Sequence, residues 1–200
     1  MIPRHAIVFA REPRFGAVKT RLAQDIGKGA AYAFYRRTLA RTVRRLAADP
    51  RWTTWLALTP PEAARRLARQ RDVAVFAQAG GDLGERMKQA FRHLPAGPAV
   101  LVGSDIPDLG PRHIARALRR LADHDAVFGP TDDGGFYLVG FANGYPTSDP
   151  FADVKWSTSH ALDDTLAKLA PKTRVALVDE LIDIDTGTDL DRWRGRSPAR

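Results

Sequence analysis

Short apolar runs alternate along the chain with segments in which apolar residues recur every three or four positions. The apolar runs have the length of strands, and the run at residues 99–103 (AVLVG) is apolar almost throughout. Such continuous runs are typical of strands that are covered on both faces. The pattern predicts strands at residues 5–10, 54–59, 73–78, 99–103, 126–129, 135–141 and 174–178.

Helices are predicted between these strands. In residues 29–48, for example, Tyr32, Tyr35, Leu39 and Val43 follow the three- and four-residue steps of one helix face. The same reasoning predicts helices at residues 29–48, 60–70, 82–94, 111–122, 157–169 and 188–194.

Two of these helices carry start signals in the sequence. Asp82 has the side chain of an N-cap, and Glu85, three residues later, is the expected capping-box partner. Ser157 or Thr158 is the expected cap of the helix at residues 157–169.

The alternation of strands and helices predicts an α/β protein with three layers, in which helices cover both faces of a mostly parallel sheet. We find no linker that would divide the chain, so residues 1–194 are expected to form one domain, followed by a frayed tail at 195–200. Ligands of open α/β sheets bind beyond the carboxyl ends of the strands. The loops that follow strands are therefore the first places to look for a functional site.

Composition narrows the class of protein. Of 200 residues, 44% are hydrophobic and 27% charged, which is ordinary for a soluble globular protein. No apolar run approaches the roughly 20 residues that a membrane-spanning helix needs, and the N-terminus shows no signal-peptide cleavage site; a cytoplasmic location is expected. The absence of cysteine excludes disulfides, thiolate metal sites and thiol catalysis.

The net charge of +8 is distributed unevenly. Residues 1–72 hold 16 of the 31 basic side chains and only 5 of the 23 acidic ones. A basic half and an acidic half suit a site that takes phosphate from one side and a metal ion from the other, although a solvated helix face would also explain many of the arginines. We find neither aromatic residues interleaved with the basic ones nor a known docking motif, so nucleic acid is not an expected partner.

A basic loop, residues 11–22 (REPRFGAVKTRL), follows the first predicted strand. It offers Arg11, Lys19 and Arg21 around the flexible Gly16. Cations and free backbone N–H groups in this position favour a phosphate-binding loop, and a basic surface loop is the alternative. The loop has neither the G-x-x-x-x-G-K-[ST] nor the G-x-G-x-x-G spacing of two well-known nucleotide-binding loops.

Carboxylates follow the fourth predicted strand. Asp105 comes directly after a buried run, where packing gives no reason for an acid, and Asp108 comes three residues later. A nucleotide-bound Mg²⁺ or Mn²⁺ needs only one or two protein carboxylates. Asp105 is the better metal-ligand candidate, whereas Asp108 could support the site or cap the helix that begins near Pro111.

A second acidic pair, Asp183 and Asp185, follows the last predicted strand. In an extended segment their side chains point the same way, because the side-chain direction alternates with period two. The pair would then attract a divalent cation. The alternative is that Asp185 and Thr186 cap the final helix, with Asp189 in its first turn.

Three weaker features complete the set of candidates. Gly134 and Gly135 in the sequence Asp-Asp-Gly-Gly would let the backbone approach a ligand, or would simply form a hairpin turn. Gly81 and Asp82 could contact a base or ribose, or only begin a helix. Trp156 could line an acceptor pocket or belong to the core.

Taken together and in order, these loops resemble a known family. The segments VFAREPRFGAVKTRLA, GGDLGERMKQAF, LVGSDIPDL, FGPTDDGGFYLVG, VKWST and DIDTGTDL look like the DUF2064 family of bacterial proteins, and the resemblance covers about residues 5–192. That family is grouped with the nucleotide-diphospho-sugar transferases of GT-A type, whose relatives include 2-phospholactate guanylyltransferase. The resemblance therefore implies a Rossmann-like GT-A fold.

The resemblance also implies roles for the candidate residues. Lys19 and Arg21 would hold nucleotide phosphates, and Asp105 would bind the metal ion and take part in catalysis, with Asp183 or Asp185 as a further ligand. Asp133 would be the second catalytic acid, near the acceptor or sugar. The remaining expected contacts are, on the nucleotide side, Arg11, Gly81 and Asp82, and, on the acceptor side, Gly134, Gly135 and Trp156.

Two departures from the related enzymes bear on the reaction. The first loop lacks the L-A-A-G-x-G-x-R-M signature of typical nucleotidyltransferases, and the usual GT-A Asp-x-Asp is replaced by Asp105-Ile-Pro-Asp108. The sequence thus predicts a glycosyltransferase that uses a nucleotide-sugar, a small-molecule acceptor and Mg²⁺ or Mn²⁺. The alternatives are a guanylyltransferase-like nucleotidyltransferase and a non-catalytic nucleotide-binding protein, and a homodimer is compatible with all three.

Overall fold

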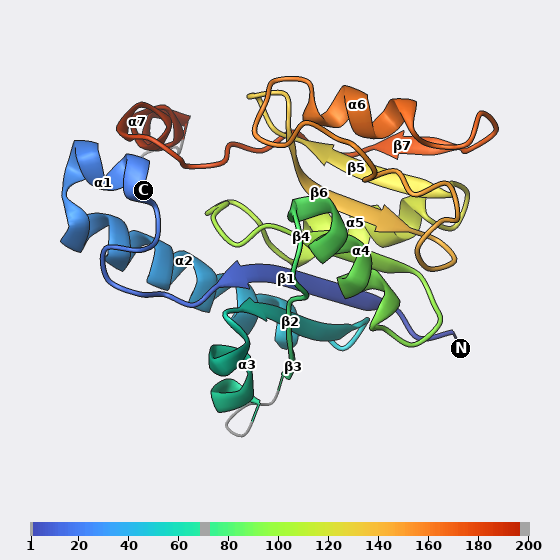
Figure 1. Cartoon of the computed structure of the whole chain (residues 1–200), viewed down its shortest axis with the longest axis horizontal. Helices are drawn as coiled ribbons and strands as arrows, with labels where there is room; N and C mark the ends of the chain where they lie inside the picture. The colour runs from blue at the N-terminus through green and yellow to red at the C-terminus, as the bar shows by residue number, and fades with distance from the viewer. Residues whose placement is uncertain (1, 69–72, 197–200) are drawn as a thin grey trace.

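A seven-stranded sheet runs through the centre of the computed structural model, which describes residues 2–68 and 73–196 (Figure 1). The strands lie in the order β3-β2-β1-β4-β6-β5-β7. Their bounds are His5–Arg11 for β1, Thr53–Thr59 for β2, Ala74–Ala77 for β3, Ala99–Val102 for β4, Ala126–Pro130 for β5, Phe136–Phe141 for β6 and Val175–Leu177 for β7.

All pairings except those of β6 are parallel. β6 is antiparallel to both β4 and β5, with Phe141 opposite Ala99 and Ala126. The prediction of a mostly parallel sheet is confirmed. The antiparallel strand arises because the Asp-Asp-Gly-Gly sequence forms a hairpin turn, in which Thr131 N–H donates to Gly135 O at 3.0 Å.

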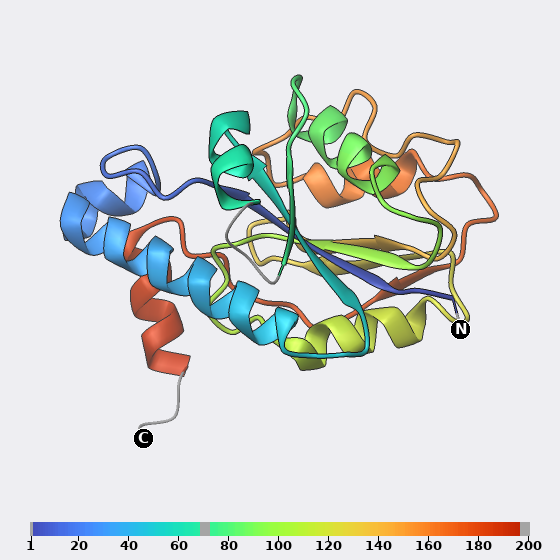
Figure 2. The same cartoon turned by 90° about the horizontal axis from the view of Figure 1, so that it is seen from below.

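Helices cover both faces of the sheet, as predicted. In Figure 2, α2 and α5 lie on one face and α4 and α6 on the other. α3 packs on β2 and β3, and α1 and α7 pack together beside α2. The bounds are Thr20–Ile26 for α1, Lys28–Ala47 for α2, Pro61–Leu67 for α3, Leu83–Arg92 for α4, Pro111–Arg120 for α5, Ala161–Ala167 for α6 and Gly187–Arg196 for α7.

Two apolar layers hold the sheet between its helices. In β4, Val100 and Val102 pack in the layer with α2 and α5, while Ala99 and Leu101 pack in the layer with α4 and α6. All four residues are buried, because both faces of a central strand are covered. This packing explains why the central strands are continuous apolar runs in the sequence.

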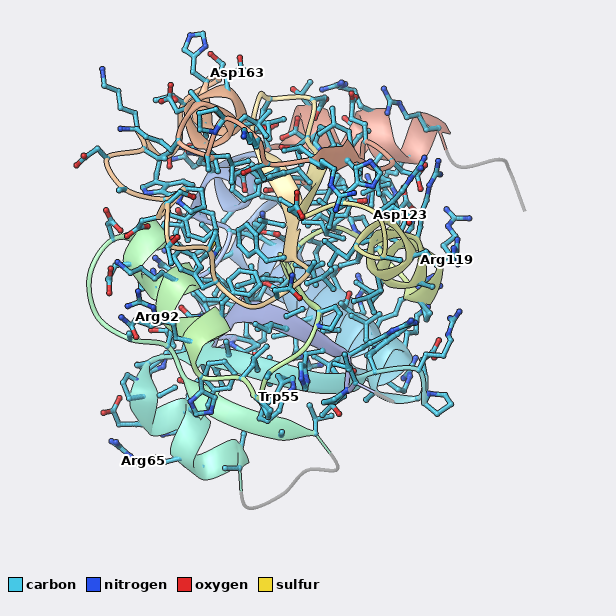
Figure 3. The ribbon with its side chains drawn as sticks, turned by 90° about the vertical axis from the view of Figure 1, so that its right-hand side faces the viewer. Trp55, Arg65, Arg92, Arg119, Asp123 and Asp163 are labelled. Carbon is cyan, nitrogen blue, oxygen red and sulfur yellow. The ribbon has the colours of Figure 1, made fainter. Side chains whose placement is uncertain are left out.

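Charged side chains lie on the outside of these layers. Figure 3 shows Arg65, Arg92 and Arg119 on the outer sides of α3, α4 and α5, and Trp55 among the side chains on the sheet. The three arginines are exposed, whereas Trp55 is half-buried. Among the residues that the structure describes, no helix is both long and apolar enough to cross a membrane.

Several predicted element ends differ from the structure. α1 begins directly after Lys19, inside the segment expected to be a loop. α6 begins at Ala161 rather than at 157, because Ser157 has a φ of 63°, which a right-handed helix cannot contain. Neither Ser157 nor Thr158 is therefore its cap. α7 extends through Arg196, so the first part of the predicted tail is helical, and residues 197–200 lie outside the described residues.

The start of α4 follows the prediction only in part. Asp82 caps the helix and accepts a hydrogen bond from Glu85 N–H at 2.8 Å. The Glu85 carboxylate does not complete a capping box, because it bonds Gln89 and Lys88 on the next turn. The predicted end of α3 near residue 70 falls outside the described residues.

Candidate functional site

Loops from distant parts of the chain meet beyond the carboxyl ends of β1 and β4. These two strands are parallel neighbours, so the loops that follow them leave the same edge of the sheet. The segment after β7 runs back past the same edge on its way to α7 (Figure 1). Lys19 comes from the first loop, Asp105 from the second, and Asp183 and Asp185 from the third.

The ammonium group of Lys19 lies among the three carboxylates. Its Nζ is 2.7 Å from Asp105 Oδ2, 3.2 Å from Asp183 Oδ1 and 2.6 Å from Asp185 Oδ1. Only 5% of the Lys19 side chain is exposed. The prediction that Asp183 and Asp185 point the same way is confirmed. Asp185 does not cap α7; Thr186 does, through reciprocal hydrogen bonds with Asp189.

The backbone of Lys19 is strained where it delivers this ammonium group. Its φ of 48° and ψ of 50° are left-handed, a conformation that costs a residue with a Cβ atom about 1–2 kcal/mol. Strained backbone of this kind collects at functional sites, where the surrounding structure maintains it. The ion pairs with the aspartates hold the Lys19 side chain in this position.

The acidic cluster has the donor set of a divalent-cation site. Ligand oxygens of Asp105, Asp183 and Asp185 all lie within 4.8 Å of one another. Carboxylate oxygens are the ligands that Mg²⁺ and Mn²⁺ prefer. Lys19 and Arg21 offset two of the three carboxylates when all three are charged, so the cluster keeps one negative charge and its oxygens fit a divalent cation.

Burial and crowding of charge change the pKa values in this cluster. Burial, together with the neighbouring Asp105 and Asp185 carboxylates, raises the pKa of Asp183 to about 8, although Lys19 acts in the opposite direction. Burial lowers the pKa of Lys19, but attraction to the three carboxylates outweighs burial and raises it above its usual value. Lys19 is therefore charged throughout the physiological pH range.

The raised pKa of Asp183 predicts a pH-dependent stability in the absence of divalent cations. Between pH 4 and 8, folded Asp183 holds a proton that the unfolded chain has released, because the folded pKa of about 8 lies above the usual value of 3.8. Its contribution to the free energy of unfolding is complete below about pH 4 and is lost as the pH rises through 8. Urea unfolding at pH 5, 6, 7 and 8 in EDTA should show a flatter pH dependence for Asp183→Asn than for the wild type. Parallel curves for the two proteins would contradict the raised pKa.

A basic cavity of about 480 Å³ opens on one side of the cluster. Its cationic lining residues are Arg11, Lys19, Arg21 and Arg86. The predicted phosphate-binding residues Arg11, Lys19 and Arg21 thus line one cavity, while Arg86 on α4 was not among the predicted residues.

A buried polar residue, Gln78, shapes this cavity and was also missed. Gln78 Nε2 donates to Ala10 O at 2.9 Å and to Ala57 O at 2.8 Å, and Gln78 Oε1 accepts a hydrogen bond from Arg86. These hydrogen bonds anchor Gln78 to β1 and β2, and Gln78 in turn holds the Arg86 guanidinium at the cavity. The signal in the sequence was the Asp82 cap, since it places Arg86 in the first turns of a helix that begins at the strand ends.

Tyr35 on α2 ties the two loops together. Its hydroxyl accepts a hydrogen bond from Arg11 N–H at 3.0 Å and lies 3.2 Å from Ser104 Oγ. Burial raises the pKa of Tyr35, so its hydroxyl stays neutral. On the buried face of α2, the Tyr35 hydroxyl therefore holds Ser104, and with it the Asp105 loop, against the end of β1.

A second cavity, of about 410 Å³, opens on the other side of the cluster. Of the residues predicted for the acceptor side, Asp133, Gly135 and Trp156 line it. Both cavities are lined by Asp105, Asp185 and Arg21, whose guanidinium lies 3.6 Å from Asp185. The acidic cluster is thus the place where the two cavities meet.

Some predicted site residues line neither cavity, and their roles in the site stay predictions. Gly81 and Asp82 line neither cavity and form the turn and cap before α4. Gly134 also lines neither; it packs against Ser159. Asp108 is exposed, and Gly110, not Asp108, precedes α5. Asp133 closes the hairpin turn as well as lining the second cavity, because its Oδ1 accepts from Thr131 Oγ1 at 2.6 Å and from Gly135 N–H at 3.0 Å.

Comparison with known structures gives a consistent picture of the fold. The chain is similar to a provisionally named nucleotide-diphospho-sugar transferase from Desulfovibrio desulfuricans G20, with 30% identity, a TM-score of 0.87, and coverage of 96% of this chain and 87% of that one. It also resembles 4-diphosphocytidyl-2C-methyl-D-erythritol synthase from Anaerococcus prevotii DSM 20548 (12% identity, TM-score 0.59, coverage 98% and 99%). A third match is the manganese complex of Rv0371C from Mycobacterium tuberculosis H37Rv (18% identity, TM-score 0.52, coverage 98% and 100%). The last two likenesses concern the fold alone.

Comparison with sequences identifies the family. A search of curated proteins found no match. The model of the family described as "Uncharacterized protein conserved in bacteria (DUF2064)" matches residues 42–158, more than half of the chain. The chain therefore belongs to the DUF2064 family, and it has the α/β fold of the nucleotide-diphospho-sugar transferases.

Proposed function

We propose that this protein is a metal-dependent glycosyltransferase that takes a nucleotide-sugar and transfers its sugar to a small-molecule acceptor. The observation that carries the proposal is the position of Lys19 and the three aspartates, which lie where the basic cavity meets the second cavity. The similarity to the Desulfovibrio desulfuricans protein named for nucleotide-diphospho-sugar transfer supports it.

The basic cavity suits the diphosphate of the donor. Arg11, Lys19, Arg21 and Arg86 would neutralise the negative charge that grows on the departing nucleoside diphosphate, which is where electrostatic stabilisation lowers the barrier. Asp105, Asp183 and Asp185 would hold Mg²⁺ or Mn²⁺ when the Lys19 ammonium group, which lies among them, turns toward the diphosphate. The cation would then add its positive charge on the phosphate side. The manganese complex of the structurally similar Rv0371C supports a divalent cation.

The second cavity suits the acceptor. Asp133 lines it, and among the described residues its Oδ2 makes no hydrogen bond, which leaves that oxygen free for a substrate hydroxyl. Trp156 and Gly135 would form part of the wall against which the acceptor lies.

Substitution of one carboxylate tests the binding part of the proposal. Asp105→Asn keeps the side-chain shape but removes a charged ligand, so it should weaken metal-dependent nucleotide binding at least tenfold. Thermal unfolding is measured with UDP, GDP, UTP and GTP, each with EDTA, Mg²⁺ or Mn²⁺. For the wild type, a nucleotide at 100 times its Kd should add about 2.7 kcal/mol of stability.

Asp108→Asn is the matched control, because it makes the same chemical change three residues away at an exposed position that lines neither cavity. It should behave like the wild type. If no nucleotide stabilises the wild type, or if Asp105→Asn binds as tightly as Asp108→Asn, the proposed site is wrong.

Product analysis separates the possible reactions. Glycosyl transfer releases a nucleoside diphosphate from a nucleotide-sugar, whereas nucleotidyl transfer releases pyrophosphate from a nucleoside triphosphate. The fold is shared with a protein from Methanothermobacter that is named a nucleotidyl transferase, so both products are assayed. Pyrophosphate release would assign the alternative reaction, and binding without either product would indicate a nucleotide-binding protein.

A further inference from the structure

The two cavities that meet at the acidic cluster differ in charge. Four cationic side chains line the basic cavity. Among the described residues of the second cavity, Arg21 is the one cationic lining residue, and its side chain is 72% exposed and already close to Asp185. Four carboxylates line the same cavity: Asp105, Asp133, Asp183 and Asp185. With Mg²⁺ or Mn²⁺ held by the other three, the Asp133 carboxylate is what an anionic ligand would meet on the acceptor side, and among the described residues no lysine or arginine other than Arg21 lines this cavity.

One wall of the second cavity is apolar. Leu83 and Met87 on α4, Leu101 on β4, Phe136 and Val139 on β6, and Trp156 contribute to it. The Trp156 ring is held edge-on by Phe136 and Phe151, with ring centroids 6.2 and 6.0 Å away. Aromatic and aliphatic side chains that are fixed in this way recognise apolar surface of a ligand.

Hydroxyl groups occupy the rim rather than cations. The exposed Ser157, Thr158 and Ser159 line the cavity in the segment before α6. Hydroxyls bind neutral oxygen atoms of a ligand, whereas recognition of phosphate or carboxylate normally uses Arg or Lys. The apolar wall and the hydroxyl rim thus both favour an uncharged ligand that has apolar surface and neutral oxygen atoms.

From this lining we infer that the acceptor is an alcohol with an apolar body and without phosphate or carboxylate groups. The inference rests on the proposed function and deepens it. In the transfer, the acceptor oxygen forms a bond to the anomeric carbon of the sugar, and the bond from that carbon to the diphosphate oxygen breaks. The electron pair leaves with the nucleoside diphosphate, and the hydroxyl proton passes to the free oxygen of Asp133.

The acceptor chemistry is tested with two probes that share an aromatic ring, phenyl β-D-glucoside and phenyl phosphate. Binding of each is followed by saturation-transfer NMR in the presence of UDP and Mn²⁺. The glucoside should bind at least tenfold more tightly than the phosphate. Trp156→Ala should weaken glucoside binding at least fivefold and leave the thermal shift by UDP and Mn²⁺ unchanged, because Trp156 does not line the basic cavity.

A second variant keeps the test decisive if Trp156→Ala does not fold. Thr158→Lys adds a cation at the exposed rim and should raise phenyl phosphate affinity about threefold. Thr147→Lys adds the same charge at an exposed position outside both cavities and should change nothing.

The outcomes separate this inference from the proposed function. Absence of a thermal shift with all four nucleotides (UDP, GDP, UTP and GTP) in the wild type would refute the proposed site itself. A normal UDP shift, combined with phenyl phosphate binding as tightly as the glucoside or with no response to the cavity variants, would overturn the acceptor assignment alone.

Discussion

Lys19→Met is expected to destabilise the cation-free protein by about 2–3 kcal/mol at neutral pH. Removal of one member of a buried ion pair typically costs about 3–5 kcal/mol, and partial exposure of the three aspartates reduces this value. The substitution keeps an unbranched side chain of similar length but removes the ammonium group that pairs with the crowded carboxyl groups. The free energy of unfolding is measured by urea titration in EDTA.

The pH dependence and the effect of added divalent cation show whether the loss of stability in Lys19→Met comes from charge. The loss should be smaller at pH 5 than at pH 7, because the crowded carboxylates of the variant take up protons as the pH falls. Mg²⁺ or Mn²⁺ should restore part of the stability of Lys19→Met, since a divalent cation can lie where the ammonium group lay. The control is Lys172→Met at an exposed lysine, which should cost less than about 0.5 kcal/mol. A metal-independent loss that is equal at both pH values would contradict the electrostatic account.

The architecture was predictable because local pattern and global fold agree. Central strands such as β4 are buried on both faces and therefore read as continuous apolar runs, and α2 shows its buried stripe in the spacing of its apolar residues. The apolar pattern of β6 does not give its direction, because a strand that is buried on both faces has the same pattern either way. The hairpin alternative for the Asp-Asp-Gly-Gly sequence implied the antiparallel pairing that the structure has. α1 was missed because its seven residues bury only Leu22.

The site was predictable as separate residues but not as one cluster. Lys19, Asp105 and Asp185 stood out because each follows a strand and has no packing reason to be there. The ion pair between Lys19 and Asp185 joins residues that are 166 positions apart in the chain. It forms because the segment after β7 passes the sheet edge where Lys19 lies. Arg86 and Gln78 were missed because a charged helix residue and a residue that ends a strand are common in any α/β protein. Only the three-dimensional structure shows that both face the basic cavity.

Gly134→Ala is expected to destabilise the protein by about 3 kcal/mol or more. Gly134 has a φ of 84°, and a left-handed conformation alone costs an alanine about 1–2 kcal/mol. The added Cβ atom would in addition lie 2.0 Å from the carbonyl oxygen of Ser159, which must move. Gly144→Ala is the matched control, because Gly144 has a φ of 79° but no heavy atom within 4 Å of the added Cβ.

The difference between these two alanine variants reports the contact between the hairpin turn and the segment before α6. Leu162 N–H donates to Gly134 O at 3.1 Å, so the turn also supports the start of α6. Displacement of Ser159 should open the second cavity and weaken binding of phenyl β-D-glucoside, while UDP binding in the basic cavity is retained. Urea unfolding measures the loss of stability, and the saturation-transfer NMR experiment measures the loss of glucoside binding. Equal destabilisation of Gly134→Ala and Gly144→Ala would show that the turn does not need this close approach, and that the second cavity depends on other contacts for its shape.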